Sequence, residues 1–345
     1  MKNIALAFIL VATCFTLRAQ NFESDNLFTT KSFKDASLKK VMATTSHGDI
    51  SVSEVPASQT RVEVYIHSGN SNQHLSKQEI QKKLDEYYTL DISLSGDVLN
   101  ASAHQKKEIL FNETGLSISF VIYVPKTASS ILKTSHGNID LKGLEGSQDV
   151  ETSHGDVSIS KITGKVVGRT SHGNVSVTDC NKDVDVSTDH GDVTSRNCEG
   201  TIKLITSHGN IDLRDIKGKV RAGTEHGDVS GNTISGELTA STSHGNVNLD
   251  GMSSSVNAST DHGDISLTAI NITGDIVMNN NNGNISIELP KGKGLDLDLQ
   301  GKDVSVDGMQ NFNGSKSRDL VKGTTNGGGI KVSARTNRGA NLTFK

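Results

Sequence analysis

Histidine is the residue type whose spacing most suggests chemistry in this 345-residue chain. Nine of the twelve histidines precede a glycine, and eight of these His-Gly pairs recur at a constant interval of 18 residues. An imidazole can take up a proton near neutral pH, act as a general base or bind a transition metal. An isolated ninth pair stands in TTSHGDI at His47, and Asn282 takes the histidine position in a degenerate tenth copy. The eight regularly spaced histidines are His136, His154, His172, His190, His208, His226, His244 and His262.

Acidic residues accompany the histidines in every second repeat. The residue after each His-Gly pair alternates between Asn and Asp through eight repeats, and Asp189, Glu225 and Asp261 fall only in the repeats with Asp. An Asp in every repeat would stack like charges ~4.8 Å apart, whereas the alternation doubles that separation. The alternation therefore indicates selection against charge repulsion, with calcium binding by the carboxylates as the alternative. The four alternating acids are Asp156, Asp192, Asp228 and Asp264.

The regularity of the repeat argues against a catalytic site. Catalysis requires one unique arrangement of groups, but the Ser-His adjacency recurs in most repeats. The chain has neither a GxSxG motif nor a spaced Cys-His metal motif, and a row of identical imidazoles does not form a closed tetrahedral site. We therefore predict no catalytic residue, no metal centre and no cofactor. Packing of histidine on histidine is the expected role of the row, and weak multivalent binding of zinc, copper or nickel is the alternative.

Two of the three cysteines occupy the same position in adjacent repeats. The Cα atoms of Cys180 and Cys198 would lie ~5 Å apart in stacked repeats, which is within the range of a disulfide. Side chains of in-register neighbours point the same way, however, which separates the Cβ atoms more than a relaxed disulfide requires. The sequence therefore predicts proximity and leaves the bond itself open.

Short strands and tight corners must position these residues. One repeat, TSHGDVSISKITGKVVGR at 152–169, contains two stretches in which aliphatic and polar residues alternate, as is typical of strands. Coils of 18 residues can stack at ~4.8 Å and place Val157, Val175 and Val193 in one internal column. We predict an all-β, right-handed parallel β-solenoid (β-helix) with 18-residue coils over residues 134–290. The aliphatic and glycine positions do not fit a left-handed hexapeptide helix or a calcium β-roll.

The remaining segments break the repeat. Residues 20–55 are expected to form an N-terminal segment and a first coil, and residues 291–345 irregular C-terminal coils. Residues 56–133 predict a small α+β capping sheet with one helix in SKQEIQKKLDEYY, where Ser76 and Glu79 can form a capping box. Such a segment suits the task of covering an open apolar end of the stack, because an exposed end would pair with other chains. A separate binding module is the alternative for this segment.

The first residues predict export. Residues 1–19 combine Lys2, an apolar run and Ala19, as a secretory signal peptide does, while Cys14 leaves a lipid anchor open. No later segment is apolar enough to span a bilayer, so we expect the protein in the periplasm or at the cell surface. The charge balance, 35 Lys and Arg against 39 Asp and Glu, has the wrong sign for a nucleic-acid-binding protein.

The order of these segments resembles a bacterial family. A strand, a helix, strands that end in YVP, and then many TSHGDV-type units are similar to the DUF4097 family, whose members are described as adhesin-like, over roughly residues 41–345. The resemblance implies a β-helical envelope protein without an assigned enzymatic activity, and it does not name a ligand. Family repeats often have Ser where this chain has His, so the regular histidines are a departure from the family.

Two classes of function follow from this sequence. The first is an exported, non-catalytic adhesin or envelope-polymer binding module, which would contact a glycan, an envelope polymer or a surface protein through its repeated polar edge. The second is a structural or envelope-stress-related periplasmic protein without a direct ligand. A polysaccharide-active β-helix enzyme is a further alternative, which the uniformity of the repeats disfavours.

Overall fold

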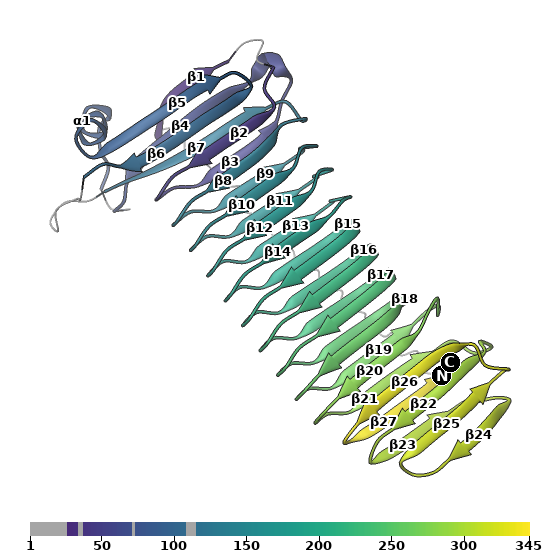
Figure 1. The fold of residues 1–345 in the computed structure, drawn as a ribbon. Coiled ribbons are helices and arrows are strands. Elements are labelled where there is room, and N and C mark those ends of the chain that lie inside the picture. Colours follow the sequence, from purple (N-terminus) through teal and green to yellow (C-terminus); the bar gives the residue numbers. More distant parts are fainter. Residues whose placement is uncertain (1–25, 34–36, 71–72, 108–114) are drawn as a thin grey trace, which may run out of the picture.

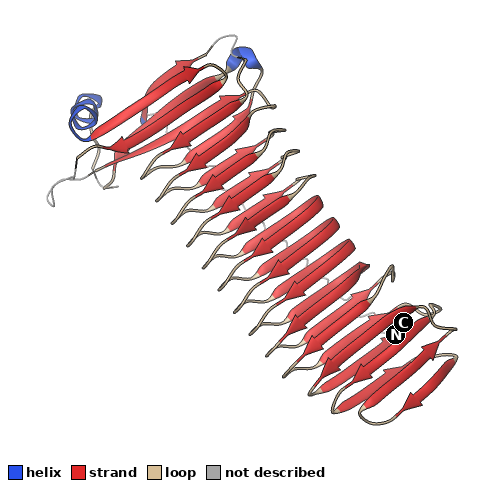
Figure 2. Cartoon of the chain, viewed as in Figure 1, coloured by secondary structure: helices blue, strands red, loops and turns tan. Residues whose placement is uncertain are grey.

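The structure, a computed structural model, describes residues 26–33, 37–70, 73–107 and 115–345. Most of these residues belong to one continuous 27-stranded sheet that is wound into a long stack, as Figure 1 and Figure 2 show. The described part of the chain is therefore mostly β, as predicted, with a single α-helix at one end. Within these ranges no helix is long and apolar enough to cross a membrane. The predicted signal peptide lies outside the described residues.

The regular repeats contribute two columns of strands on opposite sides of a narrow core. The strands are β8 (Ser129–Lys133), β9 (Ile139–Lys142), β10 (Gln148–Glu151), β11 (Val157–Ser160), β12 (Val166–Arg169), β13 (Val175–Thr178), β14 (Val184–Ser187), β15 (Val193–Ile205), β16 (Ile211–Gly223), β17 (Val229–Ser241), β18 (Val247–Thr260), β19 (Ile265–Ala269), β20 (Ile276–Asn280) and β21 (Ile285–Leu289). One column holds β9, β11 and β13, and the other holds β8, β10, β12 and β14. Each of β15, β16, β17 and β18 is one long strand that belongs to both columns.

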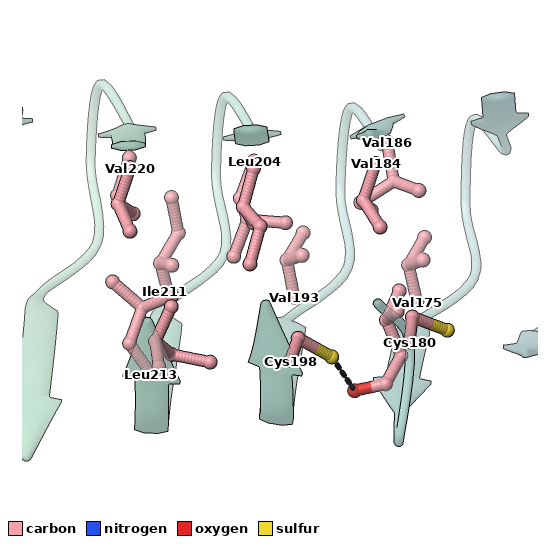
Figure 3. Packing of buried hydrophobic residues seen from close by; sticks show 14 of the residues in the cluster. Val175, Cys180, Val184, Val186, Val193, Cys198, Leu204, Ile211, Leu213 and Val220 are labelled. Carbon is pink, nitrogen blue, oxygen red and sulfur yellow. Dashed lines mark hydrogen bonds between the residues drawn. The ribbon is translucent and has the colours of Figure 1, made fainter. Parts of the chain in front are cut away.

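Aliphatic side chains from both columns fill the core. Val157, Val175 and Val193 pair in parallel register, and each is at most 1% exposed. Figure 3 shows that Val193 and Ile211 of one column point toward the opposite column. The internal valine column predicted from the alternation is therefore present.

The corner that carries the histidine, which we call the His corner, requires glycine. A Cβ added to Gly173 would lie 1.8 Å from the carbonyl oxygen of Gly155 in the preceding coil. No side chain tolerates that distance, so the coils can stack this closely only with glycine after each histidine.

The second corner contains a residue in the left-handed conformation in the seven consecutive coils from Gly143 to Gly251. Its φ is 55° at Lys161 and 57° at Thr233, and Gly143 and Gly251 occupy the same position in other coils. This conformation is unfavourable for a residue with a Cβ, and most of all for a β-branched one. The other non-glycine residues at this position are Asp179, Asn197 and Asp215.

The first coil of the stack comes from the N-terminal segment. Strands β2 (Lys40–Thr44) and β3 (Ile50–Glu54) pair in parallel with β8 and β9, and His47 forms a bridge to His136. The His47 copy, which is isolated in the sequence, is therefore continuous with the regular repeat in space. Strand β8 falls within the segment predicted to form the cap, but it stacks with the coils.

Residues before the first coil, and residues between it and the regular coils, form the small sheet at the N-terminal end. Its strands are β1 (Leu27–Ser32), β4 (Arg61–Ser68), β5 (Tyr88–Ser95), β6 (Val98–Gln105) and β7 (Leu116–Val124), with a short 3₁₀ turn at Ala57–Gln59. Strands β6 and β7 pair in parallel with β2 and β3, and the remaining pairs in this sheet are antiparallel. Helix α1 (Lys77–Tyr87) begins with the Ser76–Glu79 capping box and buries Ile80, Leu84 and Tyr87.

The C-terminal residues return to the stack out of sequence order. The strands here are β22 (Leu295–Gln300), β23 (Asp303–Asp307), β24 (Phe312–Lys316), β25 (Leu320–Thr325), β26 (Ile330–Thr336) and β27 (Gly339–Phe344). Strand β26 pairs in parallel with β20 on one side and with β22 on the other. Strand β27 pairs in parallel with β21 on one side and with β23 on the other. Strands β24 and β25 close the end with antiparallel pairs.

Candidate functional site

The His corners align nine imidazoles into one straight row, which we call the His ladder. Successive ring centroids from His47 to His262 are 4.6 to 5.0 Å apart, and successive ring planes differ by 3° or less. All nine side chains are exposed. The eight histidines predicted to form a ladder are thus joined by His47, which the sequence spacing alone could not place.

A buried threonine fixes each His corner. The hydroxyl of Thr170 donates to the carbonyl oxygen of Gly155 in the preceding coil at 2.9 Å and accepts from the backbone N–H of Gly173 at 3.2 Å. The donor bond recurs at 2.8–2.9 Å in the seven consecutive coils from Thr152 to Thr260. Sequence reasoning assigned no role to this threonine, although its presence in every regular coil was a usable signal.

The degenerate tenth copy preserves these contacts with a different side chain. Asn280 replaces the threonine, and its Nδ2 donates to the carbonyl oxygen of Gly263 at 2.7 Å. Its Oδ1 accepts from the backbone N–H of Gly283 at 2.8 Å. An amide thus supplies one donor and one acceptor in place of the hydroxyl.

The alternating Asp and Asn side chains form a second ladder beside the histidines. Each Oδ1 accepts a hydrogen bond from the backbone N–H of the equivalent residue in the next coil, for example from Asn174 to Asp156 at 2.8 Å. The same bond is 2.7–2.9 Å long in nine successive steps from Asp49 to Asn284. Because Asp and Asn accept equally well, the bond does not require the alternation. Charge separation explains it, since each carboxylate has an uncharged amide above and below.

The His corners carry acids without Lys or Arg partners. Asp189, Glu225 and Asp261 add to the alternating Asp residues, and no Lys or Arg stands between the threonine and the Asp or Asn of any regular corner. Among the described residues, none of the acids from Asp156 to Asp264 in these corners takes part in an ion pair. At neutral pH this edge is therefore an acidic line.

The ring nitrogens differ in their surroundings. The Nδ1 atoms of His208, His244 and His262 lie 3.3–3.4 Å from backbone carbonyl oxygens of the preceding coil. These carbonyls favour the tautomer with the proton on Nδ1, which leaves Nε2 as the hydrogen-bond acceptor of the ring. At the first rung, burial and then the neighbouring His136 lower the pKa of His47 below its ordinary value.

The spacing of the ladder disfavours chelation of a metal ion. A zinc–imidazole bond is about 2.0–2.1 Å long, so two rings that share an ion hold their nitrogens within about 4.2 Å. The stacked rings are parallel and 4.6–5.0 Å apart, so neighbours would have to tilt out of the stack to share one. Across the described ranges, no group of three or more His, Cys, Asp or Glu side chains is arranged to hold a metal ion.

The two cysteines lie one coil apart in the core. Each follows the histidine of its own repeat by eight residues. Cys180 is 1% and Cys198 2% exposed, and both are free thiols in this structure. The disulfide that the sequence left open stays a prediction.

Comparison with known proteins places these features in a family. The family described as Toastrack DUF4097 matches residues 82–250 and 232–340, which together exceed half of the chain. A "putative adhesin" from Parabacteroides distasonis has 13% identity and a TM-score of 0.30, covering 92% of this chain and 96% of that one. A "putative adhesin" from Bacteroides fragilis has 16% identity and a TM-score of 0.25, covering 91% and 96%.

A "putative cell adhesion protein" from Clostridium sporogenes has 9% identity and a TM-score of 0.18, covering 92% of this chain and 98% of that one. No curated protein matches the sequence. The extent of the family match shows that the chain belongs to the DUF4097 family.

Proposed function

We propose that this protein is an exported, non-catalytic adhesin that binds an extended envelope glycan along its His ladder. In this proposal the stack is a right-handed parallel β-solenoid with 18-residue coils, located in the periplasm or at the cell surface. The observation that carries the proposal is the unbroken row of nine exposed imidazoles at one strand spacing. A site that repeats along a line suits a ligand that repeats along a line, because each weak contact raises the effective concentration for the next.

The chemistry of the edge indicates what the polymer must offer. The ladder presents imidazole nitrogens and carboxylates, and its corners contain no Lys or Arg. At neutral pH such an edge accepts more hydrogen bonds than it donates, and its charge repels anionic polymers. Sugar hydroxyls supply the donors that it lacks. Stacking of sugars on aromatic rings is not the expected mode, because the coils contain few Phe or Tyr residues.

The uniformity of the coils supports a binding role over catalysis. Each coil repeats the same threonine, histidine and Asp or Asn contacts, so no coil offers the unique cluster of groups that bond cleavage requires.

A quantitative binding assay tests the proposal. The purified protein is applied to immobilised, hydroxyl-rich envelope polysaccharide and to an anionic polysaccharide, at neutral pH. A variant with His172, His190, His208 and His226 replaced by Gln is expected to bind the neutral polymer about tenfold more weakly, because four contiguous rungs are lost.

The control variant replaces four uncharged polar residues on the outer face of the second column with Gln: Ser187, Thr239, Asn257 and Ser259. It should bind like the wild type. Equal binding by both variants, or preference for the anionic polymer, contradicts the proposal.

A structural protein without a ligand is the second candidate. Its support is the set of threonine and Asp or Asn bonds, which stabilise the corner whether or not anything binds. Absence of binding to every envelope polymer tested, together with a lower melting temperature of the histidine variant, would favour this candidate.

A further inference from the structure

The core of the stack contains a group of polar side chains around Cys180 and Cys198, which the proposed function does not use. Cys180 and Cys198 occupy the position filled by Ile162 and Ile216 in the flanking coils. Three residues before Cys198, Ser195 takes the place that Val177 and Leu213 hold in the neighbouring coils. Two thiols and a hydroxyl thus stand where the flanking coils have aliphatic side chains.

One backbone bond and one side-chain bond hold the two cysteines side by side. The N–H of Glu199 donates to the carbonyl oxygen of Cys180 at 2.8 Å, so the residues after each cysteine are in register. On the other side, Asn197 Nδ2 donates to Asp179 Oδ1 at 2.5 Å. Parallel neighbours of this kind lie ~4.8 Å apart, which is inside the Cα range that a disulfide spans.

The direction of the side chains determines what must move. Figure 3 shows the Cys198 sulfur pointing toward the coil that carries Cys180, where it lies 3.8 Å from the carbonyl oxygen of Val177. The Cys180 sulfur points the same way, away from Cys198. A turn of the Cys180 side chain to another staggered rotamer would bring the sulfurs together.

Ser195 provides space for that turn. Its side chain is fully buried, and its Oγ has no hydrogen-bond partner. A valine or leucine here, as in the adjacent coils, would fill more of the column, whereas serine leaves volume beside the sulfurs and gains no hydrogen bond.

The thiols also influence each other electrostatically. The contact with Cys198 and then burial raise the pKa of Cys180, and the contact with Cys180 lowers the pKa of Cys198. These shifts apply to the closed stack, in which the two thiols contact each other.

We propose that Cys180 and Cys198 form a disulfide that joins two adjacent coils in the middle of the stack. The oxidant is an external disulfide, either a low-molecular-weight one or that of a thiol–disulfide oxidoreductase. The thiolate of one cysteine attacks it, forms a mixed disulfide and releases one thiolate. The thiolate of the other cysteine then attacks the protein sulfur of the mixed disulfide, releases the second thiolate and completes the bond between Cys180 and Cys198. Two protein thiols lose two protons and two electrons, and the external disulfide is reduced to two thiols.

Burial sets when this exchange takes place. Because both cysteines are almost fully enclosed, the external disulfide reaches them before this part of the stack closes. Once the coils have closed, the same burial shields the bond from reductants.

Peptide mapping without reduction tests the proposal directly. The protein is refolded with oxidised glutathione, alkylated while denatured and digested with trypsin. Cleavage after Arg169, Lys182, Arg196 and Lys203 places the cysteines in separate peptides, 170–182 and 197–203. The expected result is one linked species that lacks two hydrogens and separates on reduction. Two fully alkylated peptides would overturn the proposal.

A melting experiment tests the consequence for stability. Wild type refolded with oxidised glutathione should melt several degrees higher than wild type refolded with a reductant, because the link restricts the unfolded chain. The C180A/C198A variant should melt at one temperature under both conditions, which controls for effects of the redox reagents. Equal melting temperatures for the two wild-type preparations would exclude a stabilising link. Both results are independent of glycan binding.

Discussion

The two corners of each coil are built on different principles. At the His corner, specific residues recur in the regular coils. The Thr170 hydroxyl donates to the Gly155 carbonyl of the coil before, Gly173 lies against the same carbonyl, and the backbone N–H of Asn174 donates to Asp156 Oδ1. At the second corner, only the backbone conformation recurs, and residues as different as Lys161 and Thr233 adopt the same positive φ. The His corner therefore depends on which residues occupy it, and the second corner depends on the conformation of its backbone.

Substitution of glycine by alanine should give the largest difference in lost stability between the two corners. Gly173→Ala is expected to destabilise the fold by about 4 kcal/mol or more, because the new methyl group would overlap the Gly155 carbonyl. Gly251→Ala at the second corner should cost only about 1 kcal/mol, since its Cβ meets nothing closer than 3.4 Å and only the left-handed backbone is strained. Chemical denaturation measures both values. Similar costs would show that the corners do not differ as described.

Removal of one corner hydroxyl should have the next largest effect. Thr188→Val keeps the shape of the side chain but leaves the Gly173 carbonyl and the Gly191 N–H without their partner, at a cost of about 2 kcal/mol. Thr188→Ser retains the hydroxyl and should cost about half as much or less. If the valine variant is as stable as the serine variant, the threonine serves only to fill space.

Acid should loosen the His corner. The folded-state pKa of His47 is lowered, so the unfolded chain binds the proton more readily and stability is lost as pH falls through about 6.5. The neighbouring ring of His136, 4.6 Å away, contributes to this lowering after burial. We expect the melting temperature to fall by a few degrees between about pH 7.5 and about pH 5.

Two variants identify the source of this acid effect. His47→Gln should flatten the pH dependence, because it removes the imidazole whose pKa is lowered, while the four-residue histidine variant keeps His47 and should keep the fall in melting temperature. A wild-type melting temperature that is constant over this range would contradict the prediction.

The smallest expected effect is a gain at the second corner. Thr233 has a φ of 57°, which is costly for a β-branched residue, so Thr233→Gly should stabilise the fold by about 0.5–1 kcal/mol. Asp215→Gly at the equivalent position should change little, because aspartate tolerates this conformation. A loss of stability in the glycine variant of Thr233 would indicate that its side chain has a specific role.

The sequence predicted those features that depend on periodicity. The spacing of 18 residues was enough to identify the stacked strands, the internal valine column and the row of histidines, because each is a direct consequence of in-register stacking. The helix followed from its capping box and its apolar face.

Features that depend on long-range return of the chain were not predictable. The sequence predicted a first coil within residues 20–55, but the residues inserted between β3 and β8 hide the pairing of His47 with His136. The return of β26 and β27 to the stack leaves no periodic signal. The threonine bonds and the left-handed residue depend on local geometry that the pattern of aliphatic and polar residues does not encode.

At both ends of the stack, neighbouring strands are far apart in the sequence. This arrangement affects the order in which the stack folds and the ease with which its ends fray. Val41 pairs with Ser130, so the first coil cannot close until a long stretch of later chain has emerged, and the regular coils are free to assemble before it. At the other end, β27 lies between β21 and β23, so its loss would break two rows of backbone bonds instead of one. Fraying, which normally begins at the last segment of a repeat array, is therefore opposed at the final strand.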